Sequence, residues 1–129
     1  MRLALAVGLA ALALLAGCGG DGENGAEGIV FEDPTGSIDI ERGMKFTLEF
    51  SVNAGVGYDW EPAGALPASA PVALEDTRVH YESPDSAGDS GVKRFVYEAR
   101  RTGRATIVLR KLFRGDQQER RTLTVTVRG

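Results

Sequence analysis

A strict two-residue alternation of apolar and polar side chains most constrains how this 129-residue chain can fold. The alternation is clearest in three segments toward the C-terminus, whose apolar members are Phe95, Tyr97 and Ala99, then Ala105, Ile107 and Leu109, then Leu123, Val125 and Val127. Because side chains two residues apart share one face of a strand, each segment predicts a strand with one buried and one wet face. Turn-forming residues at 101–104 and 114–118 predict hairpins between these strands.

Five further strands are predicted upstream, at residues 29–31, 37–40, 44–52, 58–61 and 72–81. The last segment is interrupted by charged residues, so a helix is its competing interpretation. Seven or eight short strands, turns at near-regular spacing and no sustained helical period predict an all-β, immunoglobulin-like antiparallel β-sandwich. The inter-sheet disulfide of antibody domains is excluded because Cys18 is the only cysteine, so packing must hold the sandwich together.

The N-terminal region has the pattern of a bacterial secretion signal. A basic start at Arg2 precedes an apolar run over residues 3–15, which is short for a membrane span and ends in Leu-Ala-Gly-Cys at residues 15–18. This ending resembles the lipobox of bacterial lipoproteins, which implies that Cys18 is diacylated and becomes the new N-terminus. An ordinary signal peptide with an incidental cysteine, or a short anchor helix, is the alternative.

These patterns divide the chain into a signal peptide (1–17), a glycine-rich acidic tether (18–28) and one β-sandwich domain (29–129). Loss of Arg2 with the signal leaves 15 − 1 = 14 basic residues against 18 acidic ones, a formal charge of −4. That balance does not predict a nucleic-acid-binding surface. We expect a monomer in the cell envelope, anchored to a membrane by lipid and facing the periplasm or the exterior.

The candidate functional element is a short loop that follows the strand at 44–52. Two glycines within three residues predict a tight turn with a small tip, for which an ordinary Asn/Gly turn is the simplest interpretation. The loop contains Asn53, Gly57 and Tyr58, with Trp60 two residues further on, around a tip of Ala54, Gly55 and Val56. It resembles the Asn-Pro-Thr-Thr-Gly-Tyr loop, followed by a nearby Trp, of the chagasin-type inhibitors of papain-like cysteine proteases, in which Pro, Thr and Thr stand where this chain has Ala54, Gly55 and Val56.

Two further segments lie where this family carries its other binding loops. The family's Gly-x-Gly-Gly loop corresponds to Gly88, Asp89, Ser90 and Gly91, and its Arg-Pro-Trp loop corresponds to Lys111, Leu112 and Phe113. The resemblance covers about residues 38–127. It implies three loops at one end of the sandwich that occlude the active-site cleft of a papain-like (clan CA) protease, more weakly here because the tip residues differ. The alternative is a non-inhibitory envelope lipoprotein module that assembles with another protein.

No catalytic or metal site is predicted, so the chain is not expected to be an enzyme and needs no cofactor. His80 is the only histidine, and the sequence contains no Gly-x-Ser-x-Gly or Ser-x-x-Lys motif. Asp85, Asp89 and Asp116 lack the spacing of a calcium loop and are interpreted as turn formers. The basic stretch 100–104 is interpreted as a solvated hairpin end, with contact to an acidic partner as the alternative.

Overall fold

The computed structural model describes residues 28–81 and 90–129, and these residues form strands and connections without a helix. The strands are β1 (Ile29–Glu32), β2 (Gly36–Glu41), β3 (Lys45–Asn53), β4 (Tyr58–Pro62), β5 (Val72–Tyr81), β6 (Ser90–Ala99), β7 (Gly103–Phe113) and β8 (Asp116–Arg128). The predicted signal peptide and Cys18 lie outside the described residues. Within the described ranges, no helix is long and apolar enough to cross a membrane.

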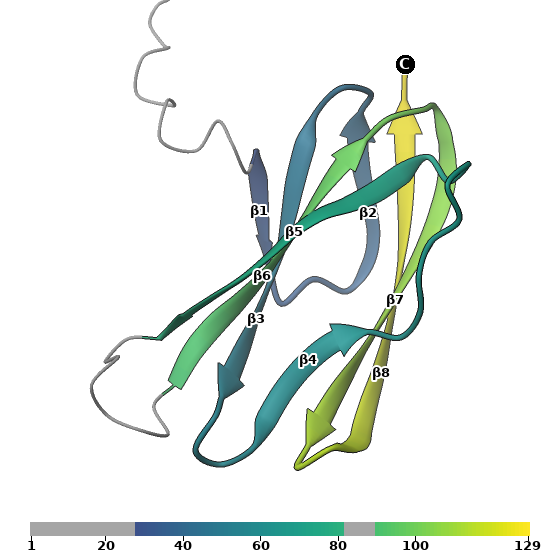
Figure 1. The fold of residues 1–129 in the computed structure, drawn as a ribbon. Coiled ribbons are helices and arrows are strands. Elements are labelled where there is room, and N and C mark those ends of the chain that lie inside the picture. The colour runs from purple at the N-terminus through teal and green to yellow at the C-terminus, as the bar shows by residue number, and fades with distance from the viewer. Residues whose placement is uncertain (1–27, 82–89) are drawn as a thin grey trace, which may run out of the picture.

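The strands pair in the order β2-β8-β7-β4-β3-β6-β5, and β1 runs parallel to β3 (Figure 1). The contact between β4 and β3 is limited to the pair Asn53 and Tyr58, where the chain turns from one layer into the other. One layer therefore contains β2, β8, β7 and β4, and the other contains β1, β3, β6 and β5. This arrangement is the all-β, immunoglobulin-like sandwich that the alternation predicts.

The side chains predicted to point inward form the core between the layers. Those of the three C-terminal segments are all at most 7% exposed. Across the layers, the Phe50 ring stacks on Trp60 with a centroid distance of 4.3 Å, and within its own layer it meets Phe95 edge-on at 6.2 Å. Because burial of each such side chain contributes about 1.5–3 kcal/mol, apolar packing replaces the absent inter-sheet disulfide.

Three predictions about individual elements are resolved by the structure. Residues 101–104 do not close a hairpin, because β6 pairs with β3 and β5 whereas β7 pairs with β4 and β8. Residues 72–81 form strand β5, so the helix alternative is wrong, and His80 lies exposed on that strand. The predicted turn at 114–118 is too long, because β7 continues to Phe113 and β8 begins at Asp116. Arg114 (φ 52°) and Gly115 (φ 89°) alone make the turn, and two successive residues with positive φ are typical of a tight two-residue hairpin.

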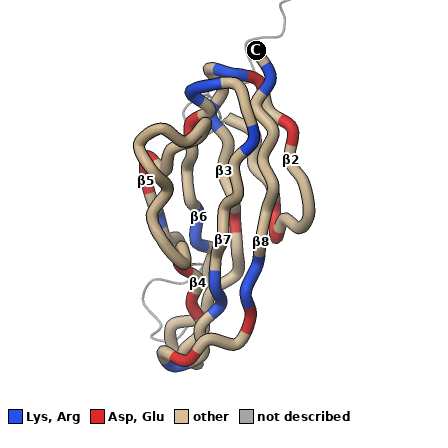
Figure 2. Tube along the Cα trace, turned by 90° about the vertical axis from the view of Figure 1, so that its right-hand side faces the viewer, with Lys and Arg blue, Asp and Glu red and all other residues tan. Residues whose placement is uncertain are grey.

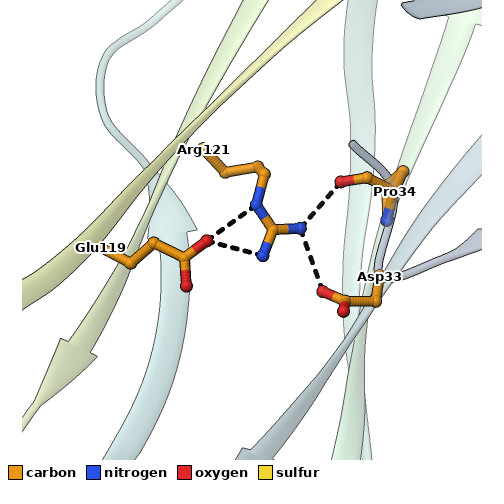
Figure 3. A network of polar contacts seen from close by, with 4 residues as sticks. All are labelled: Asp33, Pro34, Glu119 and Arg121. Atoms are coloured by element: carbon orange, nitrogen blue, oxygen red, sulfur yellow. Dashed lines mark hydrogen bonds and ion pairs between the residues drawn. The ribbon is translucent and has the colours of Figure 1, made fainter. Parts of the chain in front are cut away.

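Arg121 on β8 ties the two layers together along one side of the sandwich (Figure 3). Its guanidinium donates to Asp33 Oδ1 (3.0 Å) and to the Pro34 carbonyl (2.8 Å), and it forms an ion pair with Glu119 (2.6 Å). It also lies over the Trp60 ring at 5.1 Å, and its side chain is 14% exposed. Burial by itself would lower the pKa of Arg121, but the hydrogen bonds to Glu119 and Asp33 outweigh that effect and raise it, so the side chain stays charged.

Candidate functional site

Two hairpin ends meet at one end of the sandwich, the lower end in Figure 1. The loop between β3 and β4 lies beside the β7–β8 turn, because Tyr58 pairs with Phe113 and the Arg114 N–H donates to the Gly57 carbonyl at 2.8 Å. We call residues 53–58 and 111–115 together the crest. Residues more than fifty positions apart in sequence therefore form one continuous ridge.

Asn53 holds the first loop of the crest in shape. Its backbone carbonyl accepts a hydrogen bond from the Gly57 N–H (2.8 Å), and its side-chain Oδ1 accepts one from the Val56 N–H (3.1 Å). Its Nδ2 donates to Ser90 Oγ (3.4 Å) at the start of β6. The side chain thus closes the loop from inside, a use of Asn that is common in turns. The tip left exposed is Ala54, Gly55 and Val56, with Val56 43% exposed.

Gly57 is required by both its backbone angle and its surroundings. Its φ of 103° lies in a region that side chains disfavour. A Cβ atom at this position would stand 2.8 Å from Cγ of Arg114. Any larger residue would therefore strain the loop backbone and displace the Arg114 side chain.

Tyr58 and Trp60 support the loop from below in different ways. Tyr58 is half-buried, with its ring 5.0 Å from that of Phe113 and with Lys111 Nζ 5.0 Å from its centroid. Trp60 is 3% exposed and belongs to the core. The anchor of the loop is thus aromatic packing that continues directly into the interior.

Lys111, Leu112 and Phe113 are not a loop, although the sequence predicts them as one. They are the last residues of β7, and they pair with Trp60, Asp59 and Tyr58 of β4. A bulge after Lys111 lets β8 stay paired with β7 up to the turn. Strand pairing holds their backbones in β7. Their binding role remains a prediction.

Arg114 and Gly115 project from the turn instead; the sequence predicts both in a turn but does not assign them to the binding site. Arg114 is exposed, its guanidinium lies 5.2 Å from the Phe113 ring, and its Nε donates to the Val56 carbonyl at 3.4 Å. Arg114 therefore joins the turn to the tip of the first loop. The sequence signal was Arg114-Gly115 directly after the apolar strand end at Phe113, the pattern of a two-residue turn.

Of the predicted second loop, Gly88 and Asp89 lie outside the described residues, whereas Ser90 and Gly91 begin β6. Ser90 pairs with Asn53, so this part of the prediction does lie beside the crest. Gly91 is buried, and a Cβ there would stand 2.5 Å from the His80 carbonyl oxygen. Glycine is thus needed for the close approach of β5 and β6, while a binding role for the segment remains a prediction.

The described residues contain no group of three or more His, Cys, Asp or Glu side chains placed to hold a metal ion. What the site offers is shape: a braced loop with small side chains at its tip and a turn fixed against its flank. Fold and site together define an immunoglobulin-like β-sandwich that presents a braced loop and a tight turn at one end.

The family follows from comparison with known proteins. Residues 39–127 match the chagasin family peptidase inhibitor I42, and since this is more than half of the chain, the protein belongs to that family. A search of curated proteins gave no match.

Solved structures with the same fold carry little sequence identity. The cysteine protease inhibitor EhICP2 from Entamoeba histolytica matches with a TM-score of 0.62 and 16% identity, over 78% of this chain and 95% of that one. Amebosin matches with a TM-score of 0.58 and 19% identity, over 78% and 98% of the two chains. PbICP-C, solved in complex with falcipain-2, matches with a TM-score of 0.56 and 15% identity, over 78% and 100%.

Proposed function

We propose that this protein inhibits papain-like cysteine proteases by inserting the crest into the active-site cleft. Membership of a peptidase inhibitor family supports this, and so do the similar folds of EhICP2 and of PbICP-C, which was solved in complex with falcipain-2. The observation that carries the proposal is the loop 53–58, whose small exposed tip is closed from inside by Asn53 and flanked by Arg114.

The mechanism is occlusion and needs no chemistry from the inhibitor. A papain-like cleft lies between two subdomains, with the nucleophilic cysteine and its histidine at the bottom. A tip of Ala54, Gly55 and Val56 is narrow enough to reach that floor, while the β7–β8 turn and the start of β6 contact the walls. Affinity then comes from a preformed shape that excludes water rather than from reaction.

The same mechanism explains how the chain tolerates its altered tip. Alanine and glycine at positions 54 and 55 leave the loop with more conformational freedom than proline and threonine would, and that freedom must be lost on binding. The hydrogen bond that Asn53 Oδ1 accepts from the Val56 N–H and the one that Arg114 Nε donates to the Val56 carbonyl limit this cost by fixing the backbone beforehand. We expect inhibition that is real but weaker than a proline-containing tip would give.

Inhibition of papain and cathepsin L by the mature chain tests the proposal, with Val56→Asp as the decisive variant. A charge at the groove floor should abolish inhibition while the fold is retained, because Val56 is exposed. The matched control is Leu74→Asp, since Leu74 is 41% exposed on β5 away from the crest and should leave inhibition intact. If the unaltered chain leaves both proteases fully active at high micromolar concentration, the alternative of a non-inhibitory assembly module takes its place.

We also propose that Cys18 is lipidated, which would place the domain in the cell envelope as a membrane-anchored lipoprotein. The support is the Leu-Ala-Gly-Cys sequence at the end of the apolar run. Metabolic labelling with a palmitate analogue should mark the wild-type protein and not Cys18→Ser. Labelling of both, or of neither, would contradict the anchor without affecting the inhibition assay.

A further inference from the structure

The end of the sandwich opposite the crest gathers arginines from three separate segments. The turn between β2 and β3, the turn between β6 and β7, and the C-terminus meet there, because the Arg42 N–H donates to the Arg128 carbonyl (2.7 Å) and the Gly43 N–H to the Ala99 carbonyl (2.7 Å). Figure 2 shows several Lys and Arg segments gathered at the end that carries the C-terminus. We define the basic pole as Arg42, Arg100, Arg101, Arg104 and Arg128.

The end of the sandwich that carries the basic pole accounts for the whole positive charge excess of the described residues. These residues carry 15 − 1 = 14 basic and 18 − 6 = 12 acidic side chains, an excess of two positive charges. The pole and its neighbour Lys45 contribute six of the basic side chains, against four acidic ones at the same end, which are Asp39, Glu41, Glu75 and Glu98. The remaining described surface is therefore balanced at eight of each sign.

Two of these five arginines, Arg100 and Arg128, interact with carboxylates, and the charge of Arg100 acts on Glu75 and Glu98. Arg128 forms an ion pair with Asp39 at 2.9 Å, whereas Arg101 donates to the backbone carbonyls of Ala68 and Ala70, which are uncharged. Arg42, Arg100, Arg101 and Arg104 are all exposed. Their charges face solvent and attract an anionic partner.

The chain also enters the domain at this end. β1 runs parallel to β3 with Ile29 beside Phe46, so its first residue lies next to the basic pole. From Lys45, β3 then runs eight residue steps to Asn53, about 26 Å at about 3.3 Å per residue. The ten residue steps from Cys18 to Gly28 span at most about 35 Å. A lipid on Cys18 would therefore join the domain at the end that carries the basic pole. Because the tether can span more than the length of β3, it does not by itself set which end faces the bilayer.

We infer that the basic pole binds the anionic phospholipid headgroups of the membrane that holds Cys18, which directs the crest away from the bilayer. The inference rests on the proposed lipid anchor. Charge complementarity supports it, and so do two exposed apolar side chains at the same end, Met44 (42% exposed) and Ile29 (46% exposed), which can enter the headgroup region. Each basic side chain near an anionic leaflet raises binding about fivefold.

Vesicle sedimentation of the mature chain from residue 18, carrying Cys18→Ser, tests the inference without the lipid. Vesicles of phosphatidylcholine alone are compared with vesicles that also contain phosphatidylglycerol. We expect salt-sensitive binding only to the anionic vesicles, and a loss of about 100-fold when Arg42→Gln, Arg100→Gln and Arg104→Gln are combined. The matched control, combining Lys111→Gln, Arg114→Gln and Arg120→Gln, removes three charges elsewhere and should keep vesicle binding.

Several outcomes would overturn the inference. These are equal binding by wild type and the pole variant, an equal loss in the control variant, and an absence of binding to anionic vesicles. If binding to anionic vesicles appears only when Asp21→Asn, Glu23→Gln and Glu27→Gln are combined, the chain's own acidic segment occupies the basic pole in place of lipid headgroups. Papain inhibition and palmitate labelling, both measured on full-length protein, show separately whether the proposed inhibition and the proposed lipid anchor hold.

Discussion

Replacement of Arg114 by alanine should weaken inhibition by up to about tenfold and lower the free energy of unfolding by at most about 1–1.5 kcal/mol. The substitution removes the hydrogen bond from Nε to the Val56 carbonyl (3.4 Å) and the contact of the guanidinium with the Phe113 ring (5.2 Å). An exposed cation–π contact contributes about 0.5–1 kcal/mol, and a long, exposed hydrogen bond about 0.5 kcal/mol. The sum of about 1–1.5 kcal/mol corresponds to a factor of about 5–13 in binding.

The effect should be local because the backbone of the turn stays in place. The Arg114 N–H still donates to the Gly57 carbonyl, and alanine adopts the same positive φ at a similar cost. What changes is the fraction of molecules whose first loop is already in its binding shape, and apparent affinity falls with that fraction. Because the lost contacts also stabilise the free folded chain, the melting temperature should fall by several degrees.

The assay is the inhibition constant against papain, measured for three variants together with thermal unfolding. Arg114→Lys keeps the positive charge but loses the planar guanidinium, so it should resemble Arg114→Ala if bracing matters and wild type if charge alone attracts the protease. Arg104→Ala removes an exposed charge at the other end of β7 and should have no effect. An unchanged inhibition constant for Arg114→Ala, or an equal loss for Arg104→Ala, would refute the reasoning.

Two further predictions concern the stability of the sandwich. Arg121→Met keeps the length of the side chain but loses the contacts with Asp33, Pro34 and Glu119. It should lower the free energy of unfolding in urea by about 1–2 kcal/mol. The control Arg120→Met, on the exposed face, should change that free energy by less than about 0.5 kcal/mol. Equal effects would show that the network in Figure 3 adds no stability. Burial raises the pKa of Tyr97, so the folded state keeps the phenol neutral. An unfolded tyrosine loses its proton near about pH 10. The free energy of unfolding should therefore be unaffected by this group below about pH 10 and should fall as the pH rises above that value. Urea midpoints measured on both sides of pH 10 should fall less for Tyr97→Phe than for wild type, and an identical fall would contradict this assignment.

The sequence by itself determined the strands and the core. The alternation of apolar and polar residues predicts which side chains are buried, and it can be recognised within a few residues of sequence. Phe46, Leu48, Phe95 and Leu109 could therefore be placed in the core before any strand pairing was known. The inner support of the first loop was similarly local. The side chain of Asn53 reaches a backbone N–H only three residues away, and Gly57 is needed for a single φ angle.

The tertiary structure alone decided what surrounds that loop. Arg114 meets Val56 across 58 residues of sequence, and Arg121 meets Asp33 across 88, so no periodicity within either segment contains these contacts. The length of the β7–β8 turn followed from cross-strand pairing, which keeps residues 111–113 in β7. The basic pole likewise arises where strand pairing brings Arg42 and Arg128 together. The physical reason is the same in each case: strands pair through backbone hydrogen bonds that any sequence can make, so which side chains become neighbours depends on register and topology.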